Sequence, residues 1–251
     1  MKLIEVRSYE ELSRVAADCI IDRVKSNPAI KLGLATGGTP VGTYRNLILD
    51  HEANGTAYRQ ATTFNLDEYV GLDPSNPGSY RYFMQERLFH WIDIPAGQTH
   101  VPSGVCSDPE RECEAYEDLI RKAGGIDLQL LGIGGNGHIG FNEPGTSFHS
   151  LTHLVELDPS TREANARFFS SREEVPTHAI TMGIRTIMDS REILLLVSGE
   201  GKRQALKQLL NGPVTEEFPA SILQRHPHVT VIADSAALGR QRRKPLRESV
   251  V

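Results

Sequence analysis

Cysteine is scarce in this sequence. Only Cys19, Cys106 and Cys113 occur among 251 residues, an odd number with no C-x-x-C pair. Disulfide frameworks and cysteine zinc sites need cysteines in sets at short spacings, so we expect neither here. The low thiol content favours a protein of the reducing cytoplasm.

Long apolar runs are also missing. A membrane-spanning helix needs about 18 or more consecutive apolar residues, and no stretch of the chain approaches that length. The start of the chain, Met1–Glu5, shows neither a long apolar run nor a small-residue cleavage site. We therefore expect no membrane span and no signal peptide.

The chain has no excess of positive charge. It contains 27 Lys and Arg against 32 Asp and Glu, for a net charge of -5. This balance argues against a general nucleic-acid binder, and it means that a phosphorylated ligand would need local positive groups. Basic residues cluster only near the end, at Arg240, Arg242, Arg243, Lys244 and Arg247. We expect residues 1–240 to form a single domain and 241–251 to form a solvated, disordered tail.

What the sequence does contain is an alternation of apolar strand-like runs and amphipathic helical segments. Strands are expected at 29–35, 61–66, 126–133, 193–197 and 229–233, and helices at 10–24, 41–50, 80–88, 109–123, 160–169 and 202–210. Such alternation predicts an α/β fold with an open, mostly parallel, twisted sheet and helices on both faces, a Rossmann-like three-layer sandwich.

Four polar or glycine-rich segments lie just past predicted strands. They are Thr36–Thr39, Asp67-Glu68, the loop 132–143, and 198–202. In an open parallel sheet, ligands bind beyond the carboxyl ends of the strands. The shared placement therefore predicts one site built from all four segments.

The first segment, TGGTP, is suited to an anion. Gly37 and Gly38 allow a close approach of the backbone, and the following helix directs free N–H groups to the same place. Thr39 is the expected N-cap, with Pro40 at the first helical position. The alternative is an ordinary, well-capped junction between a strand and a helix.

Two segments resemble nucleotide-binding motifs but lack essential parts of them. SGEGK departs from the Walker A pattern, because Leu196 replaces the first glycine and Arg203 follows the lysine. Lys202 is then either a positive charge that binds a phosphate or a solvated surface lysine. Residues 132–137 spell G-x-G-x-x-G, but the glycines and Pro144 that follow leave no helix to start there. We therefore expect no nicotinamide cofactor.

The same glycine-rich loop suits proton transfer. A histidine with an ordinary pKa of about 6.5 accepts and donates protons near neutrality, and a carboxylate at Glu143 would orient His138. Asp67 is either a surface or capping acid, or a base whose pKa burial has raised. His226 and His228 lack an evident third ligand, so we interpret both as surface residues and expect no metal site.

Several long motifs, in order along the chain, resemble the glucosamine-6-phosphate deaminase family of the wider 6-phosphogluconolactonase superfamily. The resemblance runs from the N-terminus to about Ser235 and rests on LATGGTP (34–40), TFNLDEYVGL (63–72), SYRYFM (79–84), LGIGGNGHIGFNEPG (131–145), TREANARFF (161–169) and SGEGKRQAL (198–206).

This resemblance implies an amino-sugar catabolic enzyme that turns glucosamine 6-phosphate into fructose 6-phosphate and ammonia without metal or organic cofactor. His138, tuned by Glu143, would open the ring, and Asp67 would take the C2 proton. The phosphate and sugar would be held by Thr36, Gly37, Gly38, Thr39, Arg167 and Lys202. Some members of the family carry aspartate where this chain has Asn136, which orients His138 without adding charge. Ring opening should then keep its rate at lower pH than in those members.

Allosteric activation and two alternative functions can also be judged from the sequence. Activated members bind an N-acetylated sugar phosphate with basic residues in the stretch aligned to 146–155, which holds Thr146, Ser147, His153 and Val155 instead. We expect weak or no activation by N-acetylglucosamine 6-phosphate, and the sequence leaves both a monomer and a homo-oligomer open. A 6-phosphogluconolactonase would not need Asp67 as a base, because lactone hydrolysis involves no C–H abstraction. A sugar-phosphate-sensing regulator would need a DNA-binding module, which the sequence does not suggest.

Overall fold

The computed structural model describes residues 1–166, 169 and 171–240, so Arg167 and the basic segment 241–251 lie outside the described residues. A sheet of seven parallel strands forms the centre, in the order β1-β10-β9-β6-β2-β3-β5. The strands are β1 (Lys2–Val6), β2 (Lys31–Leu34), β3 (Thr62–Asn65), β5 (Thr99–His100), β6 (Leu128–Gly132), β9 (Glu192–Val197) and β10 (Val229–Asp234). The predicted open parallel sheet is confirmed, and β1 and β5 are additions at its edges.

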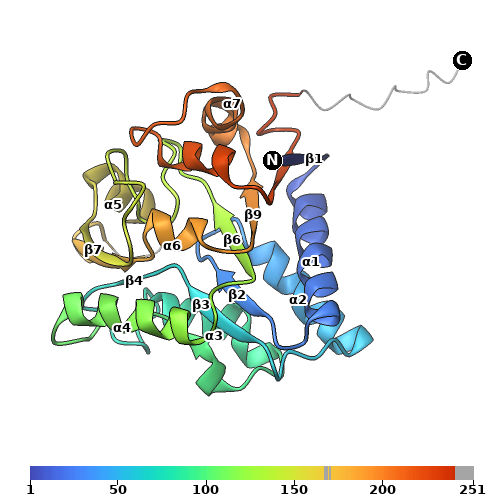
Figure 1. Cartoon of the computed structure of the whole chain (residues 1–251), viewed down its shortest axis with the longest axis horizontal. Helices are drawn as coiled ribbons and strands as arrows, with labels where there is room; N and C mark the ends of the chain where they lie inside the picture. The colour runs from blue at the N-terminus through green and yellow to red at the C-terminus, as the bar shows by residue number, and fades with distance from the viewer. Residues whose placement is uncertain (167–168, 170, 241–251) are drawn as a thin grey trace, which may run out of the picture.

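Helices cover both faces of this sheet, as predicted. Figure 1 shows α1 (Tyr9–Ser26) and α2 (Val41–Asn54) on one side, and α4 (Pro109–Lys122), α6 (Ile184–Met188) and α7 (Arg203–Asn211) on the other. The remaining helical segments are α3 (Tyr80–Arg87), η1 (Phe89–Trp91), η2 (Ala96–Gln98), α5 (Pro159–Asn165), η4 (Glu200–Lys202) and η5 (Pro219–Arg225). Within the described part of the chain, no helix has the length and apolarity needed to cross a membrane.

The alternation of side chains in the strands separates two apolar cores. In β9, Leu194 and Leu196 pack into the core formed with α1, α2 and α3. The alternate residues Ile193, Leu195 and Val197 pack into the core formed with α4, α7 and η5. Both faces of the central strands are therefore buried, which explains their almost continuous apolar sequence.

A second, antiparallel sheet was not predicted. It consists of β4 (Asp67–Tyr69), β8 (His178–Thr181) and β7 (His153–Glu156), in the order β4-β8-β7. Only Leu66 separates β3 from β4, so the chain passes at this residue from the parallel sheet into the small one. Asp67 therefore opens a new strand and pairs with Thr181, instead of standing in a loop past the first one.

The predicted cap of α2 is wrong. Pro40 itself occupies the N-cap position with a helical backbone, and no side chain caps the helix there. The hydroxyl of Tyr9, from α1, accepts a hydrogen bond from the Gly42 N–H at 2.8 Å and donates one to the Gly38 carbonyl at 3.1 Å. A residue 33 positions away along the chain thus satisfies one of the free amides at the start of α2.

Candidate active site

A cavity of about 390 Å³ opens at the carboxyl end of the central strands. From β2 the sheet continues through β3 and β5 in one direction, and through β6, β9 and β10 in the other. The loops after β2 and β6 therefore flank a topological switch point, where open α/β sheets bind their ligands. Of the predicted site residues, the cavity is lined by Thr36, Gly37, Gly38, Thr39, Asp67, Asn136, His138 and Lys202. Arg167 lies outside the described residues.

One end of the cavity is suited to an anion. The turn 36–39 and the start of α2 bring backbone amides to it, and Gly37 has a φ of 84°, a left-handed conformation that favours glycine. Lys202, the last residue of η4, adds an ammonium group from a different strand–helix junction. Helix-terminal amides and a cation together favour a phosphate group.

Asp67 is the buried acid of the cavity, with 6% of its surface exposed. Burial raises the pKa of this carboxyl to about 8, and the neighbouring charge of Glu68 contributes. Within the described residues, Oδ1 of Asp67 has no hydrogen-bond partner. A carboxylate with a pKa near neutrality is a far better proton acceptor than an ordinary aspartate.

Glu68, although adjacent, has a structural role. Its carboxylate accepts hydrogen bonds from the backbone N–H groups of Tyr80 and Arg81, both at 2.9 Å, and from the Ser79 hydroxyl at 2.7 Å. These are the first residues of α3 and its N-cap, so Glu68 anchors the helix to β4. The hydrogen bonds hold Glu68 away from proton transfer and leave Asp67 as the candidate base.

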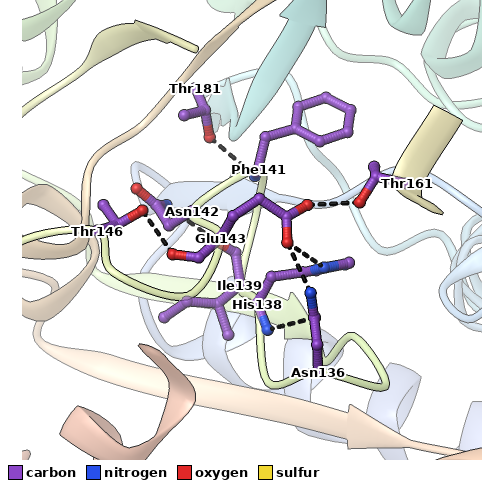
Figure 2. A network of polar contacts seen from close by, with 9 residues as sticks. All are labelled: Asn136, His138, Ile139, Phe141, Asn142, Glu143, Thr146, Thr161 and Thr181. Carbon is purple, nitrogen blue, oxygen red and sulfur yellow. Dashed lines mark hydrogen bonds and ion pairs between the residues drawn. The ribbon is translucent and has the colours of Figure 1, made fainter. Parts of the chain in front are cut away.

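His138 and Glu143 meet in the loop after β6. The Nδ1 atom of His138 lies 3.4 Å from Oε2 of Glu143, and the two side chains are 28% and 15% exposed. Figure 2 shows the carboxylate of Glu143 held between His138 and Thr161, with Asn136 on the same oxygen as His138. The Asn136 Nδ2 donates to Oε2 at 2.7 Å, and its Oδ1 accepts from the His138 backbone N–H at 3.2 Å.

These contacts keep Glu143 ionised. Burial raises the pKa of Glu143, but hydrogen bonding and charge from His138, with the hydrogen bonds from Thr161 and Asn136, outweigh it and lower the pKa below its ordinary value. An ionised carboxylate beside an imidazole fixes the orientation of the ring and stabilises its protonated form. His138 lines the cavity, so the pair could transfer a proton to or from a ligand bound there.

Glycine is required inside this loop for a steric reason. A Cβ atom on Gly134 would lie 2.5 Å from three atoms of the His138 ring, so only glycine lets the ring lie over the backbone here. No helix begins within residues 132–137, in agreement with the prediction from Pro144 and the later glycines. The G-x-G-x-x-G spelling serves the histidine and does not form a dinucleotide turn.

Two residues of the site were missed in the sequence. Tyr80 lines the cavity, donates from its hydroxyl to that of Tyr69 at 3.2 Å, and stacks on Phe141 with the ring centroids 6.0 Å apart. Thr161, at the cavity wall, donates its hydroxyl hydrogen bond to Glu143. Each stands at or next to the start of a motif quoted above, SYRYFM or TREANARFF, which was the available signal.

The histidine pair near the end of the chain is only partly at the surface. His226 is 5% exposed, and its Nε2 lies 2.8 Å from the Ser190 carbonyl oxygen. The prediction that it is a surface residue is therefore wrong: it is a buried residue with a hydrogen-bond partner. Among the residues the structure describes, no group of three or more His, Cys, Asp or Glu side chains is arranged to hold a metal ion.

Comparison with known proteins places this geometry in a family. The family model for glucosamine-6-phosphate isomerases and 6-phosphogluconolactonases matches residues 6–232. A glucosamine-6-phosphate deaminase of Geobacillus sp. (strain WCH70) is 61% identical over 95% of both chains. Glucosamine-6-phosphate deaminase 1 of Bacillus subtilis (strain 168) is 52% identical over 94% of this chain and 98% of its own.

Solved structures of related proteins have the same fold as this chain. A monomeric glucosamine-6-phosphate deaminase superposes with a TM-score of 0.94 at 51% identity, over 96% of this chain and 100% of the other. The 6-phosphogluconolactonase of Trypanosoma brucei reaches a TM-score of 0.77 at 19% identity, over 95% of this chain and 97% of its own, and shares the fold. The chain therefore belongs to the glucosamine-6-phosphate isomerase and 6-phosphogluconolactonase family and, within it, to the glucosamine-6-phosphate deaminases.

Proposed function

We propose that the chain converts glucosamine 6-phosphate and water into fructose 6-phosphate and ammonia at the cavity described above. The observation that carries this proposal is the buried Asp67, whose pKa of about 8 suits a base, in the same cavity as the turn 36–39 and as His138, which Glu143 contacts from behind the cavity lining. Opening a sugar ring and removing a proton from carbon are separate tasks. The site offers a separate group for each.

Ring opening is the task of His138. Its imidazole takes the proton from the C1 hydroxyl and returns it to the ring oxygen, so that the C1–O bond to the ring breaks. Glu143 stabilises the protonated imidazole of His138 during this step, since its carboxylate lies 3.4 Å from Nδ1. Asn136 and Thr161 hold the carboxylate in place from either side.

Isomerisation and deamination follow on the open chain. Asp67 removes the C2 proton while the aldehyde oxygen on C1 takes up a proton, which gives an enolamine. Asp67 then returns its proton to C1, and the enolamine becomes a protonated imine at C2. Water then adds to C2 and ammonia leaves, which gives fructose 6-phosphate. Positioned proton transfers of this kind contribute roughly 10²–10⁴-fold each.

Substrate orientation is assigned to the phosphate end. Thr36, Gly37, Gly38 and Thr39 would bind the phosphate through backbone amides and hydroxyls, with Lys202 as a point charge. Arg167 is proposed as a further cation on the strength of the family motif TREANARFF alone. With the phosphate fixed at the start of α2, C2 would be presented to Asp67.

Ammonia release from glucosamine 6-phosphate tests the proposal, with Asp67→Asn as the matched isosteric variant. We expect ammonia from the parent and a loss of at least about 10³-fold in the variant. Equal release from both would remove Asp67 from the mechanism. No release from the folded parent would reject the deaminase, and hydrolysis of 6-phosphogluconolactone would then be assayed, because that reaction gives no role to a carbon base.

A further inference from the structure

A second loop supports the catalytic loop from outside the cavity. Residues 215–221, here named the brace, run from the segment after α7 into η5, and none of them is among the residues that line the cavity. The brace is closed by the buried hydroxyl of Ser221, which donates to the Thr215 carbonyl and accepts from the Thr215 N–H, both at 2.9 Å. A further bond joins the Phe218 N–H to the Thr215 carbonyl at 3.1 Å. The brace is thus a fixed turn.

The brace contacts the catalytic loop on both sides of the His138–Glu143 pair. Before His138, the Ala220 N–H donates to the Gly137 carbonyl at 2.8 Å, and the buried Phe218 ring fills the place of a side chain at Gly137. A Cβ atom on Gly137 would lie 2.2 Å from that ring. After Glu143, the Gly145 N–H donates to the Glu216 carbonyl at 2.9 Å.

Glu216 adds a contact through its side chain. Its Oε1 accepts a hydrogen bond from the Phe148 N–H at 2.8 Å. The turn between Glu143 and Phe148 is closed by Thr146, whose N–H and hydroxyl donate to the Glu143 carbonyl at 3.0 and 2.7 Å (Figure 2). Glu216 therefore holds, through main chain and side chain, the turn that carries Glu143.

The distance between His138 and Glu143 makes their contact sensitive to the position of the turn 143–148. The 3.4 Å between Nδ1 of His138 and Oε2 of Glu143 is beyond an ideal hydrogen bond, so a small outward movement of the turn would separate the two groups. Misplacing a catalytic group by about 1 Å can cost roughly 10²-fold in rate. We propose that Glu216 is a positioning residue for ring opening, acting through the turn 143–148 on Glu143. This inference rests on the proposed function.

The experiment compares Glu216→Ala with Glu216→Gln and Glu217→Ala. Alanine removes the acceptor for the Phe148 N–H, whereas glutamine keeps an oxygen there. Glu217 is the exposed neighbour whose side chain has no hydrogen-bond partner within the described residues, so its alanine variant is the matched control. We measure kcat for ammonia release, and inhibition by 2-amino-2-deoxyglucitol 6-phosphate, an open-chain mimic that needs no ring opening.

We expect kcat to fall about tenfold in Glu216→Ala. Affinity for the open-chain mimic should stay within about twofold of the parent, because among the described residues no hydrogen bond joins the brace to Asp67 or to the turn 36–39. Glu216→Gln should restore most of kcat, and Glu217→Ala should match the parent. An unchanged kcat in Glu216→Ala, an equal loss of kcat and mimic affinity, or no restoration by glutamine would overturn the inference. A parent that releases no ammonia would instead reject the proposed function.

Discussion

At the residue scale, the position of Asp67 determines its chemistry. The same carboxyl in water would be ionised at almost any physiological pH and would bind a proton weakly. In the cavity, burial first and the charge of Glu68 second raise its pKa to about 8. The structure thus makes this common side chain a candidate base, and at neutral pH its protonated form predominates.

The raised pKa gives a pH dependence of activity. Only the ionised carboxylate can accept the C2 proton, so kcat/KM should fall about tenfold per pH unit as the pH drops below about 8. A profile of kcat/KM from pH 6 to 9.5, corrected for the amine and phosphate titrations of the substrate, measures this. A flat profile across that range would contradict the role of Asp67.

The same group should influence stability with a definite sign. The folded state binds the Asp67 proton more tightly than the unfolded state does, so this residue makes the fold less stable as pH rises from about 4 to 8. Asp67→Asn removes that loss. Its thermal midpoint should exceed that of the parent by several degrees at pH 9, at about 2–4 °C per kcal/mol, and the difference should shrink as pH falls towards 4. Scanning calorimetry of both proteins at pH 5, 7 and 9 tests the trend, which a pH-independent difference would refute.

Asn136 gives the third prediction at this scale. In Asn136→Asp, a carboxylate would replace the amide that now lies 2.7 Å from Oε2 of Glu143. Two such carboxylates share a proton at low pH and carry two charges at higher pH. The added charge stabilises protonated His138, so the acid limb of the kcat profile should move to higher pH than in the parent. Asn211→Asp, an exposed residue at the end of α7, is the control for added charge, and superimposable profiles for Asn136→Asp and the parent would reject this account.

At the scale of elements, the contact between α1 and α2 bears on the turn 36–39, the proposed phosphate site. The Tyr9 hydroxyl joins the Gly38 carbonyl to the Gly42 N–H, so α1 fixes the turn that begins α2. Pro40 occupies the N-cap position of α2 and no side chain of that residue caps the helix, so the Tyr9 hydroxyl accepts the backbone hydrogen bond that an N-cap side chain usually accepts.

Removing that hydroxyl should weaken substrate binding more than chemistry. Each lost hydrogen bond costs about 0.5–1.5 kcal/mol, so Tyr9→Phe should raise KM about fivefold with little change in kcat, and inorganic phosphate should inhibit it less well. Tyr82→Phe, in α3, is a suitable control because its hydroxyl makes no hydrogen bond within the described residues. A fall in kcat at constant KM would mean that Tyr9 acts elsewhere.

At the scale of the whole molecule, regulation is the open property. The relative that superposes with a TM-score of 0.94 is a monomeric glucosamine-6-phosphate deaminase. In this chain the stretch 146–155 contains no lysine or arginine, and Thr146 within it is engaged with Glu143. We propose that the chain acts without activation by an N-acetylated sugar phosphate.

Substrate saturation measured with and without N-acetylglucosamine 6-phosphate tests this proposal. We expect hyperbolic curves with the same half-saturation point in both conditions. Light scattering, compared with the 27.8 kDa mass of one chain, then decides between a monomer and a homo-oligomer. A lower half-saturation point in the presence of the N-acetylated sugar would reveal an activator site. A hexamer or dimer in solution would show that the surface of the chain carries an interface.

Local patterns in the sequence were sufficient for the α/β class, the longer helices and the central strands, because apolar periodicity and glycine punctuation are encoded residue by residue. The five-residue helix α6 was not predicted. The local patterns also predicted that the turn 36–39, Asp67 and His138 would meet at one site, and the three line one cavity, whereas their roles in binding and proton transfer stay predictions. The antiparallel sheet was invisible, because strands of three or four residues such as β4 carry too short a pattern.

Only the tertiary structure decided the properties that depend on distant parts of the chain meeting. Burial of Asp67, which raises its pKa, requires the packing of both sheets around it. The cap from Tyr9 and the support from Glu216 join residues 33 and 68 positions apart through single hydrogen bonds, which leave no periodic trace. The sequence by itself therefore determined which groups can do the chemistry, whereas long-range packing determined their protonation and alignment.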